Sequence, residues 1–179
     1  YLCFFNIETN EIKKNIVLIG MMGSGKSSIG KRLSKILLLD FIDIDYKIEK
    51  IENRTIVDIF KKNGEDYFRK IEEEISVSCL RLSNKIISLG GGGYINPKIR
   101  EQCFKNCISI WLKWKNETLI NRIKNNKKRP LANILNASEI KKLIFERSKI
   151  YNSSDYKINC DKLNINQIIK KIIKIYDKI

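Results

Sequence analysis

A glycine-rich segment near the N-terminus carries the clearest chemical pattern in the sequence. Residues from Gly20 to Ser27 match the P-loop pattern GxxxxGK[ST]. The glycines let backbone N–H groups turn toward phosphate oxygens, and the helix that follows adds its positive N-terminal end. Lys26 is expected to reach the β- and γ-phosphates, and Ser27 to offer its hydroxyl to Mg²⁺. The expected nucleotide-binding residues of this segment are Gly23, Ser24, Gly25, Lys26, Ser27 and Ser28.

Two carboxylates come next along the chain. Asp43 and Asp45 close a short apolar run, which predicts a strand at about 41–45. Residues two apart on a strand point to the same side of the sheet. Near a P-loop, one carboxylate could support Mg²⁺ while the other accepts a hydroxyl proton. On an exposed edge they would be ordinary surface charges.

Four further motifs follow in a fixed order. They are Gly64-Glu65-x-x-Phe68-Arg69-x-x-Glu72, Ser88-Leu89-Gly90-Gly91-Gly92, Arg129-Pro130-Leu131 and Arg147-x-x-x-Tyr151. Together with the P-loop and the DIDxxIE segment that begins at Asp43, they resemble the shikimate kinase family in order and spacing. The resemblance implies a P-loop kinase that uses ATP and Mg²⁺ to convert shikimate to shikimate 3-phosphate.

The same resemblance assigns an acceptor site. Arg69 and Arg147 would clamp the shikimate carboxylate, a task that suits the planar guanidinium fork. Glu72, one turn after Arg69, could hold that guanidinium in place. Gly91 would offer its backbone amide to a shikimate hydroxyl, where a side chain would block the approach. Asp45 would bind the reacting 3-hydroxyl and act as base or orienter.

On the nucleotide side, the resemblance places Asp43 in the outer shell of Mg²⁺ and Arg122 against the adenine as a cation–π contact. Arg122 could equally be ordinary helix surface. The segment at about 124–136 is polar, basic and contains Pro130, which predicts a mobile lid between two helices. Arg129 on this lid would close over the phosphates and neutralise charge that develops during transfer.

Three departures from the family pattern are visible. Ala132 stands where the family motif has a second leucine after Arg-Pro-Leu, and Gly93 lengthens the glycine run. The stretch from Cys160 to Asn164 has no clear counterpart, so the remaining contacts to the base stay open.

Short apolar runs alternate with helical patterns along the chain. Strands are predicted at about 15–19, 41–45, 85–89, 108–112 and 157–160. Helices are predicted at about 26–38, 65–82, 96–104, 116–124, 138–151 and 164–178. This alternation predicts one α/β domain over residues 1–179, with a three-layer P-loop kinase fold, a five-stranded parallel sheet and helices on both faces. Ligands of such sheets bind beyond the carboxyl ends of the strands.

The bulk composition narrows the function classes. The 179 residues carry a net charge of +15, but the lysines are scattered without interleaved aromatics, so no nucleic-acid partner is expected. No apolar run is long enough for a membrane helix. Five cysteines and no histidine argue against a zinc site and for reduced thiols in a cytoplasmic compartment. A plastid-like location or fusion to other pathway enzymes stays open, and no obligate protein partner is evident.

Three alternatives remain beside the leading hypothesis. One is another small P-loop kinase, acting on gluconate or on a nucleoside monophosphate. Another is a non-catalytic relative, although Lys26, Asp45 and both clamp arginines are all present. The third is a nucleic-acid-binding module, which only the net charge supports.

Overall fold

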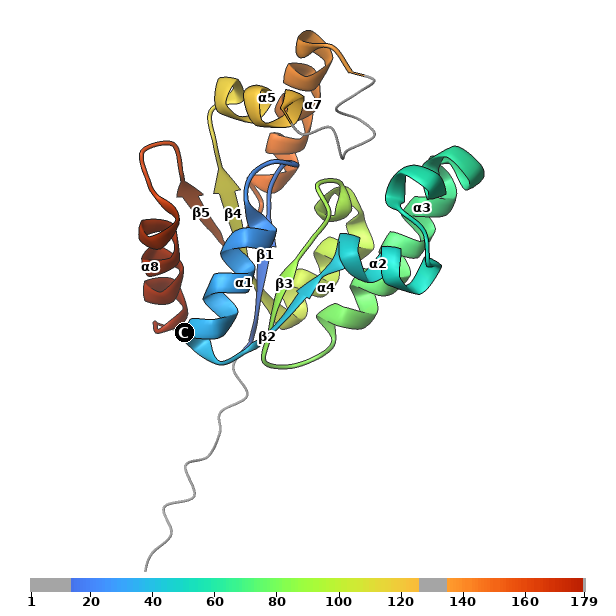
Figure 1. Ribbon diagram of the computed structural model, residues 1–179. Coiled ribbons are helices and arrows are strands. Elements are labelled where there is room, and N and C mark those ends of the chain that lie inside the picture. Colours follow the sequence, from blue (N-terminus) through green and yellow to red (C-terminus); the bar gives the residue numbers. More distant parts are fainter. Residues whose placement is uncertain (1–13, 126–134, 179) are drawn as a thin grey trace, which may run out of the picture.

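Five parallel strands form one sheet at the centre of the molecule (Figure 1). The computed structural model describes residues 14–125 and 135–178. The strands are β1 (Asn15–Ile19), β2 (Asp40–Asp43), β3 (Lys85–Ser88), β4 (Cys107–Lys113) and β5 (Tyr156–Asn159), in the spatial order β2-β3-β1-β4-β5. The helices are α1 (Lys26–Leu37), α2 (Ile44–Glu52), α3 (Ile56–Leu80), α4 (Pro97–Asn106), α5 (Asn116–Lys124), α7 (Ala137–Tyr151) and α8 (Ile165–Tyr176).

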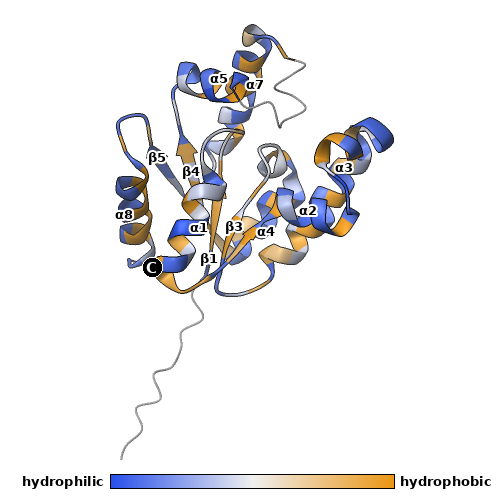
Figure 2. Cartoon of the chain, viewed as in Figure 1, coloured by the Kyte–Doolittle hydropathy of each residue, from blue (hydrophilic) through white to orange (hydrophobic). Residues whose placement is uncertain are grey.

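The side chains of β1 show how the layers are built. Its residues are all buried, and successive residues face opposite sides of the sheet. Ile16 and Leu18 pack into the cluster that holds the inner faces of α1 and α8. Val17 and Ile19 pack into the cluster that holds residues of α3, α4 and α7. Figure 2 shows the apolar strands β1, β3 and β4 between helices that carry hydrophilic residues on their outer surfaces.

The predicted three-layer fold with five parallel strands is confirmed. The helix expected from Glu65 is the second part of α3, because the non-helical backbone of Gly64 (φ 82°, ψ 176°) interrupts that helix. Sequence reasoning missed α2, the first part of α3 and a short 3₁₀ turn at Gly93–Ile95. Within the described ranges, no helix combines the length and apolar character that a membrane span requires.

The carboxyl ends of four strands meet at one edge of the sheet. β1 leads into Gly20, β2 ends at Asp43, β3 leads into the glycine run, and β4 leads into Trp114. The pairing registers are parallel throughout, so these loops gather at the same edge. The P-loop, Asp43 and the glycine run lie at this edge, and Asp45 is in the first turn of α2. The candidate arginines come from later turns of α3, α5 and α7.

Candidate functional site

The P-loop has the structural context that its sequence predicts. It joins the buried strand β1 to the N-terminus of α1. Gly20, Gly23 and Gly25 have φ values of 142°, 79° and 89°, a region that side chains disfavour. The Ser24 N–H donates to the Met21 carbonyl at 3.1 Å, which closes the loop on itself. This backbone fits a cradle of N–H groups for phosphate oxygens.

Lys26 is folded into that loop. Its Nζ donates to the carbonyl oxygens of Gly20 at 2.8 Å and Met21 at 3.1 Å, and the residue is 6% exposed. Ser27 is half-buried, whereas Ser28 is exposed. The Ser24 hydroxyl is buried and has no hydrogen-bond partner among the described residues. The predicted nucleotide residues of this segment therefore lie together around one loop.

Asp43 and Asp45 are close in space, but the predicted reason was wrong. β2 ends at Asp43, and Asp45 belongs to the first turn of α2 rather than to the strand. The Asp43 carboxylate caps this helix by accepting the Tyr46 N–H at 3.3 Å, so the helix begins at Ile44, one residue before the predicted end of the strand. The alternation of a strand therefore does not orient these two side chains.

The glycine run after β3 brings the charged residues together. A Cβ at Gly90 would lie 2.5 Å from Glu72 Oε1 and 2.6 Å from Asp45 Oδ1. A Cβ at Gly92 would lie 2.5 Å from Arg69 Nη1. All three distances are far below a normal contact, so only glycine lets these carboxylates and this guanidinium approach the turn so closely.

Arg69 is held between two carboxylates of its own helix. Its Nη1 donates to Glu72 at 2.6 Å, and its Nε and Nη2 donate to Glu65 at 3.1 and 2.9 Å. The side chain of Glu72 is only 3% exposed. Burial raises the pKa of the Glu72 carboxyl, and the negative charge of Asp45 acts in the same direction, while Arg69 opposes both. The predicted contact between Glu72 and Arg69 is confirmed.

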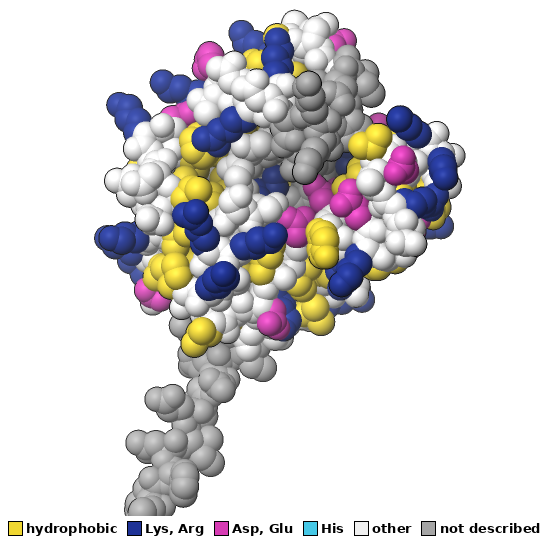
Figure 3. Space-filling model, viewed as in Figure 1, with side chains coloured by type: hydrophobic (Ala, Val, Ile, Leu, Met, Phe, Trp, Pro, Cys, Tyr) yellow, Lys and Arg dark blue, Asp and Glu magenta, His cyan; other side chains and the backbone are white. Residues whose placement is uncertain are grey.

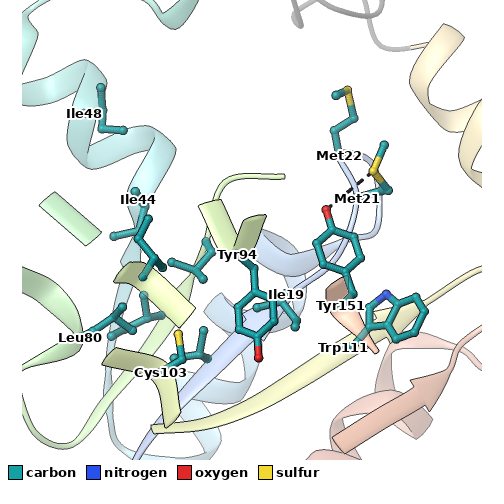
Figure 4. Packing of buried hydrophobic residues seen from close by; sticks show 14 of the residues in the cluster. Ile19, Met21, Met22, Ile44, Ile48, Leu80, Tyr94, Cys103, Trp111 and Tyr151 are labelled. Atoms are coloured by element: carbon teal, nitrogen blue, oxygen red, sulfur yellow. Dashed lines mark hydrogen bonds between the residues drawn. The ribbon is translucent and has the colours of Figure 1, made fainter. Parts of the chain in front are cut away.

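Arg147 reaches the same turn from α7. Its Nη1 donates to the Gly91 carbonyl at 3.0 Å, and the Tyr151 hydroxyl donates to the same oxygen. Burial raises the pKa of Tyr151 to about 12, so this hydroxyl keeps its proton. Figure 4 shows the Tyr151 hydroxyl directed at the Met21 sulfur of the P-loop, with the Trp111 ring packed beside it. The sequence pointed to Tyr151 only as a motif member, and this contact to Gly91 was missed.

The P-loop and the glycine run touch at Gly91. A Cβ there would lie 3.0 Å from the Met22 backbone nitrogen and 3.5 Å from Arg147 Nη1. The phosphate-binding loop, the two arginines and the carboxylate pair therefore share one small region. In Figure 3, acidic side chains gather beside a hollow in the middle of this face, while basic side chains are spread around it.

A pocket of about 520 Å³ adjoins the other side of the P-loop. Its wall includes Ser24, Gly25 and Ser28, and it also includes Trp114 and Arg122. The C-terminal segment left open by the sequence contributes Leu163, Asn164 and Ile165. The guanidinium of Arg122 lies 3.8 Å from the centre of the Trp114 ring, although the side chain is exposed. The structure therefore places Arg122 at a pocket beside the P-loop.

Arg129 and the Arg129-Pro130-Leu131 motif lie outside the described residues, as does most of the predicted lid at about 124–136.

Comparisons with known proteins agree with this geometry. A sequence model of the family described as shikimate kinase matches residues 22–177. A shikimate kinase of Thermoanaerobacter pseudethanolicus is 40% identical over 164 residues, which cover 91% of this chain and 96% of that protein.

Two solved structures share the fold. A shikimate kinase from Acinetobacter baumannii, solved in complex with shikimate, superposes with a TM-score of 0.88 at 28% identity, covering 94% of this chain and 95% of that one. The shikimate kinase from Aquifex aeolicus gives a TM-score of 0.80 at 36% identity, covering 89% of this chain and 94% of that one. With the P-loop, the glycine run and the arginine pair in one site, this chain belongs to the shikimate kinase family.

Proposed function

We propose that this chain transfers the γ-phosphoryl group of ATP to the 3-hydroxyl of shikimate, giving shikimate 3-phosphate and ADP. The observation that carries the proposal is the turn at Gly90–Gly92. This turn lies against the P-loop, the guanidinium groups of Arg69 and Arg147, and the carboxylates of Asp45 and Glu72. Phosphoryl transfer depends mainly on positioning donor and acceptor in line. A turn that touches both binding regions supplies that positioning.

Arg69 and Arg147 are assigned to the acceptor carboxylate. They come from different helices, α3 and α7, and both reach the glycine run. Each guanidinium has five N–H donors, and the hydrogen bonds that each one makes within the described residues use only some of them. Two guanidinium groups around one turn fit a planar carboxylate with hydroxyls on a ring.

Asp45 is assigned to the reacting hydroxyl. Its carboxylate oxygen lies beside Gly90, on the same turn as the arginines. A carboxylate in this place can accept a hydrogen bond from the acceptor hydroxyl and take its proton as the bond to phosphorus forms. Gly91 would offer its amide to another hydroxyl, since a side chain there would meet the P-loop backbone at 3.0 Å.

The P-loop fits ATP, and the nearby oxygens fit Mg²⁺. The three left-handed glycines and the N-terminus of α1 favour the β- and γ-phosphates. Ser27 and Asp43 would hold Mg²⁺ with the phosphates and waters, a mode of binding that needs few protein ligands. Mg²⁺ bound there supplies charge neutralisation for the phosphates. Lys26 would move from the Gly20 and Met21 carbonyls to the phosphate oxygens.

Two assignments rest on the sequence motifs. Arg129, on the lid predicted at about 124–136, is assigned to the transferred phosphate. Arg122 is assigned to the adenine, which its place at the pocket beside the P-loop supports. We also keep the expectation that the enzyme works in a cytoplasmic compartment.

The test is ADP release with shikimate, gluconate and nucleoside monophosphates offered in turn, with Mg²⁺ and with chelator. Release should require shikimate and a divalent metal. Lys26→Ala serves as the control for contaminating kinases and should be inactive. Faster turnover with gluconate or a nucleoside monophosphate would overturn the assignment.

A further inference from the structure

Trp114 connects two parts of the nucleotide region that are far apart in sequence. It directly follows β4, and its indole Nε1 donates to the Ser24 carbonyl of the P-loop at 2.9 Å. The side chain is partly buried and packs against both core clusters. The ring therefore has a fixed position relative to the P-loop.

The Trp114 ring supports Arg122. The guanidinium carbon lies 3.8 Å from the ring centre, the shortest cation–ring distance among the described residues. Arg122 Nη1 also approaches the Gly23 carbonyl at 3.4 Å. An exposed arginine otherwise samples many rotamers, and ordering one costs side-chain entropy. Stacking on a fixed indole removes part of that cost before any ligand arrives.

Both side chains line the pocket of about 520 Å³ that adjoins Ser24 and Gly25. A nucleotide whose phosphates lie in the P-loop would bring its base toward this pocket. The remaining wall comes from α1 and from residues 163–168, and it includes the apolar Leu163 and Ile165. Such a mixture of flat, apolar and polar groups suits a purine.

We propose that Trp114 is a positioning residue for nucleotide binding, which holds Arg122 flat as a platform for the base and ties that platform to the P-loop through Ser24. The proposal rests on the proposed use of a nucleotide and adds a residue to it. It does not depend on the identity of the acceptor. Trp114 acts through Arg122, so its loss should affect the nucleotide and leave the acceptor site intact.

Steady-state kinetics provide the first test. Trp114→Leu removes the ring, whereas Trp114→Phe keeps a ring but loses the N–H donor. We expect Trp114→Leu to raise KM for ATP several-fold, up to about tenfold, with KM for shikimate unchanged at saturating ATP. Trp114→Phe should lie between Trp114→Leu and wild type. A parallel rise in both KM values would indicate a general packing defect and overturn the proposal.

A double-mutant cycle shows whether Trp114 works through Arg122. In an Arg122→Ala background, Trp114→Leu should add little to KM for ATP, because the platform is already gone. The same rise in both backgrounds would contradict the proposal. Phe145→Leu is the matched control, since Phe145 carries an exposed stack with Lys149 at 4.5 Å on α7. That variant should leave KM for ATP unchanged.

Fluorescence gives a readout that requires no acceptor. The sequence has two tryptophans, so Trp111→Phe leaves Trp114 as the single emitter. Titration with ADP should change its emission, and Arg122→Ala should reduce that change. If Trp111→Phe does not fold, the difference between wild type and Trp114→Phe gives the same signal. ADP binding without any emission change would overturn the proposal even if shikimate turnover is normal. An emission change without shikimate turnover would instead count against the proposed acceptor.

Discussion

Arg69 and Glu72 form a 2.6 Å ion pair in which the side chain of Glu72 is almost completely buried and that of Arg69 is 31% exposed. The other oxygen of this carboxylate, Glu72 Oε1, approaches Gly90, as does the carboxylate of Asp45. Glu72 therefore orders Arg69 from the protein side, while the exposed carboxylate of Glu65 accepts from Nε and Nη2 on the outer side. This arrangement has a cost, because a buried carboxylate loses hydration that one ion pair only partly replaces.

The first prediction follows from the raised pKa of Glu72. Because folding raises this pKa above 4.5, the folded state binds the proton more tightly than the unfolded state. The associated stability is fully present below pH 4.5 and is lost as the pH rises through the folded-state value. The unfolding free energy of wild type should therefore fall relative to Glu72→Gln as the pH rises from 4.5. Urea denaturation between pH 4 and 8, taken as a rough working range, measures the difference.

Glu101 is the control for this prediction. Lys105 lowers the pKa of this exposed carboxyl through a side-chain hydrogen bond. The small contribution of Glu101 to the unfolding free energy therefore has the opposite pH dependence. It should be present above pH 4.5 and be lost as the pH falls. A difference in unfolding free energy between wild type and Glu72→Gln that stayed constant over the whole pH range would contradict a raised pKa of Glu72 in the folded state.

The second prediction concerns the acceptor clamp. Arg69→Ala or Arg147→Ala should weaken shikimate binding by about 1.5–3 kcal/mol per lost charged hydrogen bond, with ATP binding little changed. Calorimetric titration of each ligand measures both effects. Arg54→Ala is the control, because Arg54 forms its ion pair with Glu52.

Arg69→Ala also leaves the buried Glu72 without its closest cation, which can destabilise the fold. The titration is therefore repeated in Arg69→Ala/Glu72→Gln, where that charge is removed. Unchanged shikimate affinity in all of these variants would exclude the two arginines as the carboxylate site.

Much of the fold was predictable because its signals are local. The buried run at 15–19, the left-handed glycines and the helix after Lys26 fix the P-loop within one short stretch. The amphipathic pattern of α8 likewise predicts a helix that covers one face of the sheet. These elements follow from periodicity and turn chemistry, which neighbouring residues determine.

The parts that were wrong or missed depend either on a choice between two local structures or on contacts across the chain. From the sequence, Asp43 could either continue the strand or cap a helix. In the structure it caps α2, because its carboxylate accepts the Tyr46 N–H. The role proposed for Trp114 depends on Ser24 and Arg122, which contact its ring from two other segments. Tyr151 meets Gly91 across the sheet edge. For the role proposed for Trp114, the signal available in the sequence was a tryptophan directly after the strand β4.

The third prediction separates chemistry from binding at Asp45. Asp45→Asn keeps the shape of the side chain but removes the charge that draws the hydroxyl proton. Turnover should fall by about 10²–10⁴, while calorimetry still detects both ligands. Asp66→Asn alters an exposed carboxylate of α3 and should leave turnover unchanged. Near wild-type turnover in Asp45→Asn would exclude Asp45 as base or orienter.

The fourth prediction tests the role of Arg129, which its sequence motif alone supports. Arg129→Ala should lower turnover by about 10² or more, because a charged donor to the transferred phosphate acts in the transition state. Shikimate affinity should stay nearly intact. Lys128→Ala removes a neighbouring positive charge and should have a much smaller effect. Equal losses in both variants would assign the effect to local charge rather than to Arg129.

The last prediction compares two alanine substitutions in the glycine run, at Gly92 and Gly93, to test whether the position of Arg69 matters for acceptor binding. At Gly92 an added methyl group would lie 2.5 Å from Arg69 Nη1, so the guanidinium must move away from its position beside Glu72. At Gly93 the nearest atom would be Glu72 Oε1 at 3.4 Å, which a small shift accommodates. Neither residue has a left-handed backbone, so strain does not separate the two substitutions.

Gly92→Ala should therefore weaken shikimate binding by a similar amount to the loss of one charged hydrogen bond, about 1.5–3 kcal/mol, and leave ATP binding unchanged. Gly93→Ala should bind both ligands nearly as wild type does. Calorimetry with shikimate and with a nucleotide compares the two variants directly, and thermal unfolding checks that both are folded. If Gly93→Ala lost as much shikimate affinity as Gly92→Ala, the effect would arise from the flexibility of the turn. The position of Arg69 beside Gly92 would then not be what recognises the acceptor.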